Sequence, residues 1–395
     1  WSGSGARVAY GRMDASDRRR ILLVSHTLRP GSGWGPFASN AAAGLLAAGH
    51  EVLSLVHSRS DHPCAQTTGL PAVLSPIASR LARARTAMAV AAVARRWKPD
   101  LIHVLVEPYA PGPRLAGRPA PRPPAVRTRQ GSRRAPPSAA PGARRSLARV
   151  YRDAAAFLSC SEYTSARVLE GVHDACGAEL AASVAARIRR FRFGIGPSTF
   201  VPATGNDVRR IMFAGEVKPR KGVLELIRAC GELRRRSVIP FRLDIIGRLR
   251  EGEEYVRLLR AAIMEEGLEE AVVLRGTVSD GELAEAYRRA DAFAMLSKRD
   301  GFDFEGFGLV YLEAASRGIP VVSSLDSGGA EALKNGVTGY AVAHDDRGAV
   351  ANALRRIFEG EIRREDCRAW ADEHTIARQT GRFEEVYAEA LTASA

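Results

Sequence analysis

Residues 301–322 of this 395-residue chain contain two glutamates, Glu305 and Glu313, set eight residues apart around a glycine-rich turn. The turn contains Gly306 and Gly308, and glycine lets backbone amides approach an anion closely. A helix is expected to begin after the turn, where free N–H groups favour a phosphate. Glu313 would then lie roughly 8–9 Å further along, at about 1.5 Å per residue. The two carboxylates can therefore flank a diphosphate, one directed to a sugar and the other to a ribose.

The segments around this turn predict a parallel α/β sheet. Apolar runs at 292–296 and 319–324 are typical of buried strands. A second glycine turn, Ser327 to Glu331, follows and starts another helix. Turns at neighbouring strand ends converge on one crevice, where open α/β sheets bind ligands. The isolated pattern also fits an ordinary loop with two solvated glutamates, but the flanking strands favour a ligand site.

The stretch 293–343 resembles the Glu-x7-Glu region of the family 4 retaining glycosyltransferases, and weaker similarity covers about residues 20–360. The resemblance implies a GT-B fold, an α/β architecture of two Rossmann-like domains facing across a cleft. In that family the first glutamate, here Glu305, approaches the transferred sugar, and the second, here Glu313, binds the ribose. The turn amides that would meet the diphosphate are those of Gly306, Phe307, Gly308 and Leu309.

The same resemblance predicts four segments in the chain. An N-terminal extension covers 1–19, and an acceptor-binding domain covers 20–200. A nucleotide-sugar-binding domain follows at 201–372. A last helix in 373–395 is expected to pack back toward the N-terminal domain.

Two features of the first half bear on the site. A strand at 20–25 leads into a glycine loop, where Gly33 and Gly35 are expected to face the donor. Where relatives carry a histidine that contacts the transferred sugar, this chain has Gln130. Glutamine can donate a hydrogen bond to a hydroxyl but cannot take a proton at neutral pH.

The second half contains the expected phosphate loop. It begins at Gly215, and relatives carry an arginine just after that glycine and a lysine just before the next one. Lys221 matches the lysine, whereas Glu216 reverses the charge of the arginine. Lys218 and Arg220 could supply the missing positive charge, and these two residues with Lys221 are the nearest candidates to pair with Glu216. We expect Glu216 to point out of the phosphate pocket or to bind a substrate hydroxyl, and Arg275 to lie near the nucleotide base.

The resemblance also implies the chemistry. Relatives retain the anomeric configuration, and in the usual proposal the leaving diphosphate accepts the acceptor's proton. Catalysis then depends on charge stabilisation and positioning, for which Glu305, Lys221 and Gln130 are the catalytic candidates. No metal and no cofactor beyond the nucleotide diphospho-sugar are expected. The 298–304 loop resembles that of GDP-mannose enzymes, so we expect GDP-mannose or a UDP-sugar as donor and a glycan, glycolipid or small molecule as acceptor.

An arm at 111–150 has ten arginines, nine prolines and no acid, so it is expected to lie mostly outside the core, without regular structure. Either it is a solvated arm whose composition reflects a GC-rich genome, or it covers the acceptor site and meets an anionic surface. The net charge of +14 suits peripheral contact with an anionic membrane. Nucleic acid is disfavoured because the arm offers no aromatic residue for base stacking.

The cysteines indicate where the protein is expected to be located. Five scattered cysteines predict reduced thiols in a cytoplasmic protein without a structural metal, located at the inner membrane face if the peripheral contact exists. No apolar run reaches about 18 residues. Because of Glu216 and Gln130, the chain could instead be a GT-B protein that binds a nucleotide or glycan without turnover. Because of the arm, a polyanion-binding module is a third alternative. A Rossmann dehydrogenase is disfavoured because no Gly-x-Gly-x-x-Gly follows the first strand.

Overall fold

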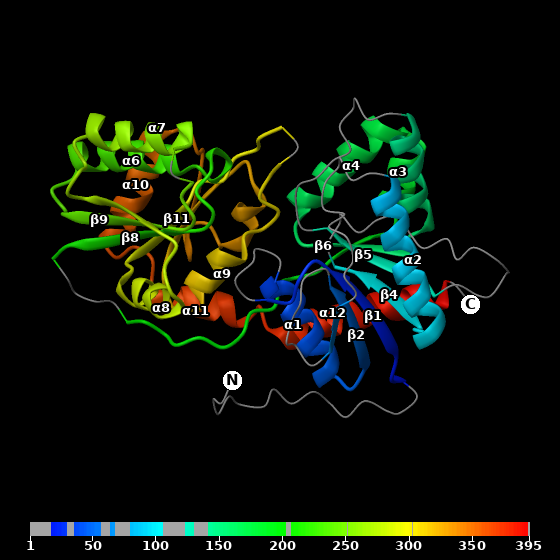
Figure 1. Cartoon of the computed structure of the whole chain (residues 1–395). Helices are drawn as coiled ribbons and strands as arrows, with labels where there is room; N and C mark the ends of the chain where they lie inside the picture. The colour runs from blue at the N-terminus through cyan, green and yellow to red at the C-terminus, as the bar shows by residue number, and fades with distance from the viewer. Residues whose placement is uncertain are drawn as a thin grey trace. The chain divides into compact units, whose positions relative to one another are not determined.

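A computed structural model describes residues 17–29, 35–56, 64–67, 80–105, 123–129, 141–202, 207–250, 252–301 and 303–393. The chain divides into two compact units. The first combines Trp1–Gly196 with Thr375–Ala395, and the second is Pro197–His374. Each unit contains one parallel sheet with helices on both faces (Figure 1).

The first unit contains a seven-stranded sheet in the order β3-β2-β1-β4-β5-β6-β7 within the described residues. Its strands are β1 (Arg20–Ser25), β2 (Glu51–Val56), β3 (Ala65–Thr67), β4 (Leu101–Val104), β5 (Ala125–Arg129), β6 (Ala156–Ser159) and β7 (Ile188–Arg190). Its helices are α1 (Gly35–Ala47), α2 (Arg80–Trp97), α3 (Pro141–Asp153), α4 (Glu162–Cys176), α5 (Ala178–Ala185) and α12 (Ile376–Thr392).

The last helix, α12, completes the core of the first unit. Phe383 is fully buried and packs its ring against Phe37 of α1 and Phe191. On the adjoining sheet face His103 Nδ1 lies 2.6 Å from the Tyr387 hydroxyl. Burial lowers the pKa of His103 to about 3, so the imidazole stays neutral in the core. Residues before the crossover at 196–197 and residues after the crossover at 374–375 thus build one hydrophobic interior, that of the first unit.

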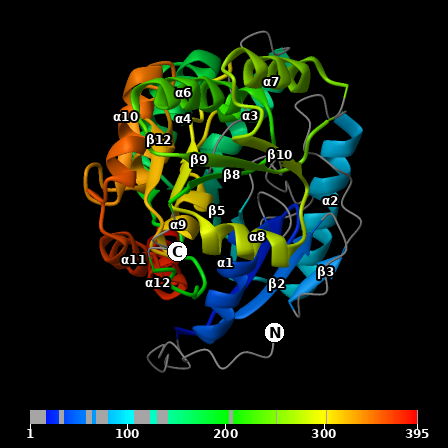
Figure 2. The ribbon, with the colours of Figure 1, turned by 90° about the vertical axis from the view of Figure 1, so that its left-hand side faces the viewer.

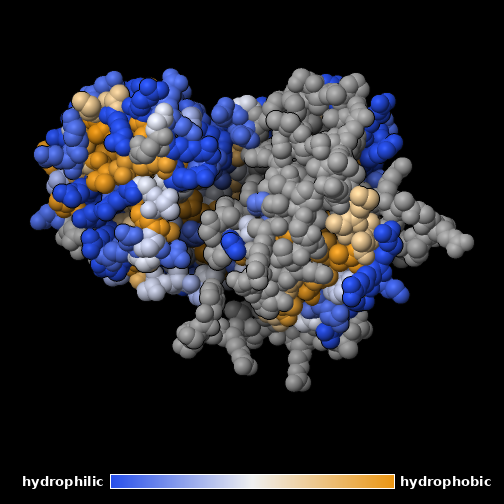
Figure 3. Space-filling view, viewed as in Figure 1, coloured by the Kyte–Doolittle hydropathy of each residue, from blue (hydrophilic) through white to orange (hydrophobic). Residues whose placement is uncertain are grey.

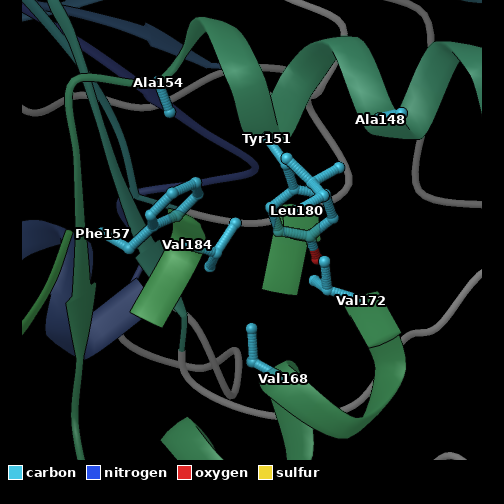
Figure 4. Packing of buried hydrophobic residues seen from close by; sticks show 8 residues of the cluster. All are labelled: Ala148, Tyr151, Ala154, Phe157, Val168, Val172, Leu180 and Val184. Atoms are coloured by element: carbon cyan, nitrogen blue, oxygen red, sulfur yellow. The ribbon is translucent and has the colours of Figure 1, made fainter. Parts of the chain in front are cut away.

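The opposite face of this sheet is covered by α3, α4 and α5 (Figure 4). Tyr151 of α3 packs against Phe157 of β6 at a ring-centroid distance of 5.6 Å. Val172 of α4 and Val184 of α5 extend the same cluster. The three helices therefore form one packed layer, with α3 anchored by its inward face.

The expectation that the 111–150 arm lacks regular structure is wrong for two described parts of it, β5 and α3. The five residues of β5 contain no proline, so all their N–H groups can join the ladder between β4 and β6. The only proline of α3 is its first residue, Pro141, where a helix tolerates a missing N–H. Arg127 of β5 is only 6% exposed, so one arginine of the arm lies in the core. Apart from Pro123 and Pro124, the rest of the arm lies outside the described residues.

The second unit contains a six-stranded sheet in the order β10-β9-β8-β11-β12-β13 among the residues described there. Its strands are β8 (Arg209–Ala214), β9 (Phe241–Ile246), β10 (Val272–Gly276), β11 (Ala292–Met295), β12 (Val321–Ser324) and β13 (Gly339–Val342). Its helices are α6 (Val223–Arg236), α7 (Glu254–Glu265), α8 (Asp280–Arg289), α9 (Leu309–Ala315), α10 (Arg347–Phe358) and α11 (Arg364–Asp372).

Helices cover both faces of this second sheet. Figures 1 and 2 show α6, α7 and α10 on one face, and α8 and α9 on the other. The predicted strand, glycine turn, helix and strand order is confirmed by β11, α9 and β12. A capping box begins α8, since the Ser279 side chain accepts from the Glu282 amide while the Glu282 side chain accepts from the Ser279 amide.

The visible surface of the second unit mixes hydrophilic and apolar residues (Figure 3). Exposed large apolar side chains on this unit include Val238, Leu258 and Met264. Single exposed apolar residues of this kind are ordinary on soluble domains. Throughout the described parts of the chain, no helix combines the length and apolarity that a bilayer span requires.

Candidate active site

The centre of the site is Glu305, at the turn between β11 and α9. Its Oε2 atom accepts a short hydrogen bond from the Lys221 ammonium group and lies 3.4 Å from Arg220 Nη1. Ser297, just beyond β11, places its hydroxyl 3.4 Å from the same oxygen. The side chains of Arg220, Lys221 and Glu305 are only 13%, 14% and 15% exposed. Two largely buried cations therefore share one carboxylate.

The charges of this cluster determine its protonation. Burial raises the pKa of Glu305, but the attraction of Lys221 and Arg220 outweighs it and holds the pKa well below its usual value. Burial lowers the pKa of Lys221, opposed by Glu305. Glu305 is thus ionised at neutral pH.

Local backbone geometry brings the two cations to Glu305. Arg220 and Lys221 lie in a single 3-10 turn, Pro219–Lys221, that ends at Gly222 with φ of 68°. A Cβ atom at Gly222 would lie 2.0 Å from the Leu296 carbonyl oxygen, so only glycine lets the loop reach the end of β11. The Lys298 amide donates to the Arg220 carbonyl at 2.8 Å and joins the loop to the segment after β11. The loop after β8 and the end of β11 are thereby held side by side.

The two predicted glycine turns converge. The Gly328 amide donates to the Glu305 carbonyl at 2.9 Å. A Cβ atom at Gly328 would lie 1.9 Å from the Gly306 carbonyl oxygen, so the two backbones are in direct contact. Gly308 has φ of 82° and directly precedes α9. Phe307, between the turn glycines, is buried, and Leu309 is the first residue of α9.

Two residues beneath the turn were not identified from the sequence. Tyr311 is fully buried, and its hydroxyl donates to the Met295 carbonyl at 2.5 Å. Ser324 donates to the carbonyl of Ser297, the residue whose hydroxyl approaches Glu305. Both are ordinary residues of a buried strand or helix, so only the three-dimensional register reveals that they support the turn.

Glu216 is directed to cations other than those near Glu305. Its carboxylate lies 2.8 Å from Lys218 Nζ and 3.0 Å from Arg248 Nη2, with Arg250 Nη2 at 3.5 Å. Of the three expected candidates, Lys218 does pair with Glu216. Arg220 and Lys221 do not, because their cationic groups are on Glu305 instead. The two arginines on Glu216 come from the segment after β9, which sequence spacing could not place.

The remaining predicted residues of this unit lie on two different elements. Glu313 lies in α9, and its Oε2 accepts from the Tyr287 hydroxyl at 3.4 Å. Burial raises the pKa of Glu313, opposed by Arg317 and Tyr287. Arg275 binds Asp244 through Nε at 2.8 Å. It lies on the edge strand β10, three strands from β11, or about 14 Å across the sheet.

Of the three predicted site residues in the first half of the chain, the structure describes one. Gly35 is the first residue of α1 and is buried. Gly33 and Gln130 lie outside the described residues. Within the described chain, no group of three or more histidine, cysteine, aspartate or glutamate side chains is placed to hold a metal ion.

Comparison with known families divides the chain as the structure does. Residues 199–374 match the model of the glycosyl transferases group 1, and residues 32–175 match the glycosyl transferase 4-like domain. The two regions fall in the second and the first structural unit.

Curated relatives match part of the chain. The GDP-mannose-dependent alpha-(1-6)-phosphatidylinositol monomannoside mannosyltransferase of Mycolicibacterium smegmatis is 33% identical over 227 residues, 54% of this chain and 56% of that protein. The D-inositol 3-phosphate glycosyltransferase of Pseudarthrobacter chlorophenolicus is 32% identical over 184 residues, 44% of this chain and 42% of that protein. The chain thus spans about half the length of the curated relatives it matches.

Solved structures match nearly the whole chain at lower identity. A glycosyltransferase from Rickettsia africae has a TM-score of 0.72 at 15% identity, covering 95% of this chain and 99% of that one. The Anabaena protein HepE, solved with UDP and glucose, has a TM-score of 0.65 at 15% identity, covering 94% and 100%. These similarities confirm the predicted GT-B fold. The chain belongs to the glycosyltransferases of the family 4 type, with a 4-like domain followed by a group 1 domain.

Proposed function

We propose that this chain is a retaining, metal-independent glycosyltransferase that takes its sugar from a nucleotide diphospho-sugar. The observation that carries the proposal is the unequal charge around Glu305. Two largely buried cations, Lys221 and Arg220, share a single carboxylate, so the cluster keeps a net positive charge. An anion of high charge density, such as a diphosphate, is the natural partner for that charge.

The predicted residues around the Glu305 turn then have separate roles in the proposal. Lys221 and Arg220 stabilise the charge that develops on the leaving diphosphate. Glu305 accepts a hydrogen bond from the transferred sugar, and the amides of the 306–309 turn bind the phosphates. Glu313, with its partner Tyr287, accepts from the ribose hydroxyls. In the transfer step the sugar's bond to the diphosphate breaks, the acceptor oxygen bonds to the same face of the sugar, and the acceptor proton passes to the leaving phosphate oxygen.

The relatives favour particular substrates. One is GDP-mannose-dependent by name, and another was solved with UDP and glucose. We therefore propose GDP-mannose or a UDP-sugar as donor. The named acceptors of the relatives include a phosphatidylinositol mannoside and an inositol phosphate, which supports a glycan, glycolipid or small polar acceptor here. The net charge of +14 supports peripheral contact with an anionic membrane.

A thermal-shift screen of GDP, UDP and ADP tests the donor site. A ligand that binds only the folded state adds about 2.7 kcal/mol of stability at one hundred times its dissociation constant. We expect one of the three to raise the melting temperature of the second unit. If none of them does, the donor-site proposal is wrong.

A protein that binds a nucleotide without turnover is the second candidate, favoured by the pairing of Glu216, where relatives have an arginine, with three other cations. Release of nucleoside diphosphate from the matching nucleotide sugar distinguishes the two. An enzyme releases it in repeated turnovers, whereas a binding protein titrates the nucleotide and releases none.

A further inference from the structure

The first unit contains an arginine-lined groove that the proposed transfer reaction does not use. It lies between α3 and the end of α4 and has a volume of about 310 Å³. Small-molecule sites typically begin at about 300 Å³. The groove is lined by Arg144, Arg145, Ala148, Arg149, Arg152, Ala175 and Cys176. No acidic residue is among these lining residues.

Three exposed arginines of the groove lack an acidic partner within the described residues. Arg145, Arg149 and Arg152 are exposed, and within the described chain none of them has a carboxylate at ion-pair distance. Several exposed arginines of other helices lie beside acids one helical turn away. Three such pairs are Arg235 with Glu232, Arg355 with Glu359, and Arg382 with Glu385. The charges of Arg145, Arg149 and Arg152 are therefore not balanced by an acid among the described residues.

The helix dipole explains this charge only at the C-terminal end of α3. The first turn of α3 contains Arg144 and no acid, and positive charge near a helix N-terminus is unfavourable. The last carbonyls of α3 already have a cation, since Arg187 donates to the Tyr151 carbonyl at 2.9 Å and to the Arg152 carbonyl at 3.3 Å. On its inward face, α3 packs Ala148 and Tyr151 into the apolar cluster (Figure 4). The helix dipole therefore disfavours Arg144 in the first turn, whereas Arg152 in the last turn is favourably placed.

We propose that this groove binds a phosphate-bearing group. Guanidinium groups donate paired hydrogen bonds that match phosphate oxygens, and several of them around one concave site favour a dianion. The ligand is either the headgroup of an anionic lipid or a free phosphorylated molecule. This proposal does not depend on the glycosyl-transfer function, because its measurements follow binding and not turnover.

Cys176 provides a direct measurement of occupancy. It is half-buried in the groove wall, whereas the other four cysteines, Cys64, Cys160, Cys230 and Cys367, are buried. A neutral thiol reagent such as iodoacetamide should therefore modify Cys176 first, which a Cys176→Ala variant verifies. We expect labelling to slow when glycerol 3-phosphate or phosphatidylglycerol vesicles are added, and to stay unchanged with phosphatidylcholine vesicles.

Charge-removal variants test the arginines themselves. Arg145→Gln with Arg149→Gln removes two charges from the groove. Arg95→Gln with Arg96→Gln, two exposed arginines of α2 in the same unit, removes the same charge elsewhere and serves as the control. Binding of glycerol 3-phosphate is measured by calorimetry and binding of phosphatidylglycerol vesicles by co-sedimentation, with circular dichroism verifying the fold. We expect the removal of each arginine to weaken binding by up to roughly tenfold, so the double variant should lose about tenfold or more in affinity. The control should stay close to wild type.

The outcomes separate the two ligand sources. Loss of vesicle binding alone assigns the groove to a lipid headgroup, and loss of glycerol 3-phosphate binding assigns it to a free phosphorylated molecule. Equal losses in the groove and control variants would show that only overall charge matters and would overturn the proposal. Labelling of Cys176 that no phosphate compound slows would overturn it as well.

Discussion

At the scale of single residues, the central feature is that Glu305 is surrounded by more positive charge than it can neutralise. Lys221 and Arg220 both contact the same carboxylate oxygen. An arriving diphosphate would compete with Glu305 for these cations. In the proposed reaction the carboxylate would then be free to accept a hydrogen bond from the sugar.

Replacement of Glu305 should separate turnover from nucleotide binding. Glu305→Gln keeps the size of the side chain but removes the charge, so we expect turnover to fall by about 10²–10³-fold. Affinity for the nucleoside diphosphate should be unchanged or tighter, because a repelling carboxylate is gone. Steady-state kinetics and calorimetry measure the two quantities, with Glu373→Gln, from the exposed Lys334–Glu373 pair, as the control. Loss of affinity equal to the loss of turnover would contradict this role.

Glu216 should contribute a pH-dependent stability. The hydrogen bond from Lys218 lowers its pKa to about 2 despite the opposing effect of burial, with further help from Arg248. Because the pKa of Glu216 is lower in the folded state, its ionised carboxylate stabilises the fold at pH values above its usual pKa near 4.5. This stabilisation is lost as the pH falls toward 2. Since the side chain is 37% exposed, Glu216→Gln should cost roughly 0.5–1 kcal/mol at pH 7.

Urea unfolding of wild type and Glu216→Gln at several pH values tests this expectation. The difference in the free energy of unfolding should be constant above about pH 5.5 and should shrink on acidification through the window set by the lowered pKa. A difference that is the same at pH 3 and pH 7 would show that Glu216 acts through packing and not through charge.

At the scale of elements, the site depends on loops that only glycine allows to meet. Gly328→Ala would place a methyl group 1.9 Å from the Gly306 carbonyl oxygen. The two turns must then separate, and we expect weaker nucleotide binding and a loss of at least about 1–3 kcal/mol in stability. Gly281→Ala in α8 is the matched control, because its Cβ would contact nothing within 4 Å. Equal effects of the two variants on nucleotide affinity would contradict this account of the turn.

Most elements of the second unit were predictable from the sequence, and so was the convergence of the two glycine turns. Apolar runs and glycine turns act locally, so β11, α9 and β12 could be predicted. The ion-pair partners of Glu216, and the hydrogen bond by which Tyr311 supports the turn, depend on how side chains from distant segments are directed. The spacing of residues along the sequence does not specify these directions. In the arm, overall proline density concealed two short segments, β5 and α3, that are locally compatible with regular structure.

At the scale of the whole molecule, α12 belongs to the first unit although it follows the second unit in the chain. Phe383 is fully buried there, and its ring packs against His103 and Tyr387 of the same unit. We expect Phe383→Ala to destabilise the first unit by about 3–5 kcal/mol. In calorimetric unfolding, the transition that a nucleotide does not shift should move to lower temperature. A shift of the nucleotide-sensitive transition alone would contradict this assignment of the helix.

The most direct measurement of the central claim is the turnover of Lys221→Ala at saturating donor, using the nucleotide sugar whose diphosphate stabilises the wild type. Lys334→Ala, which removes an exposed and paired lysine from the same unit, is the matched control. If Lys221 stabilises the leaving diphosphate, its loss should cost about 2–4 kcal/mol of transition-state stabilisation, or roughly 30- to 1,000-fold in turnover, while the control keeps its rate. An unchanged rate for Lys221→Ala would remove the Glu305 cluster from the mechanism.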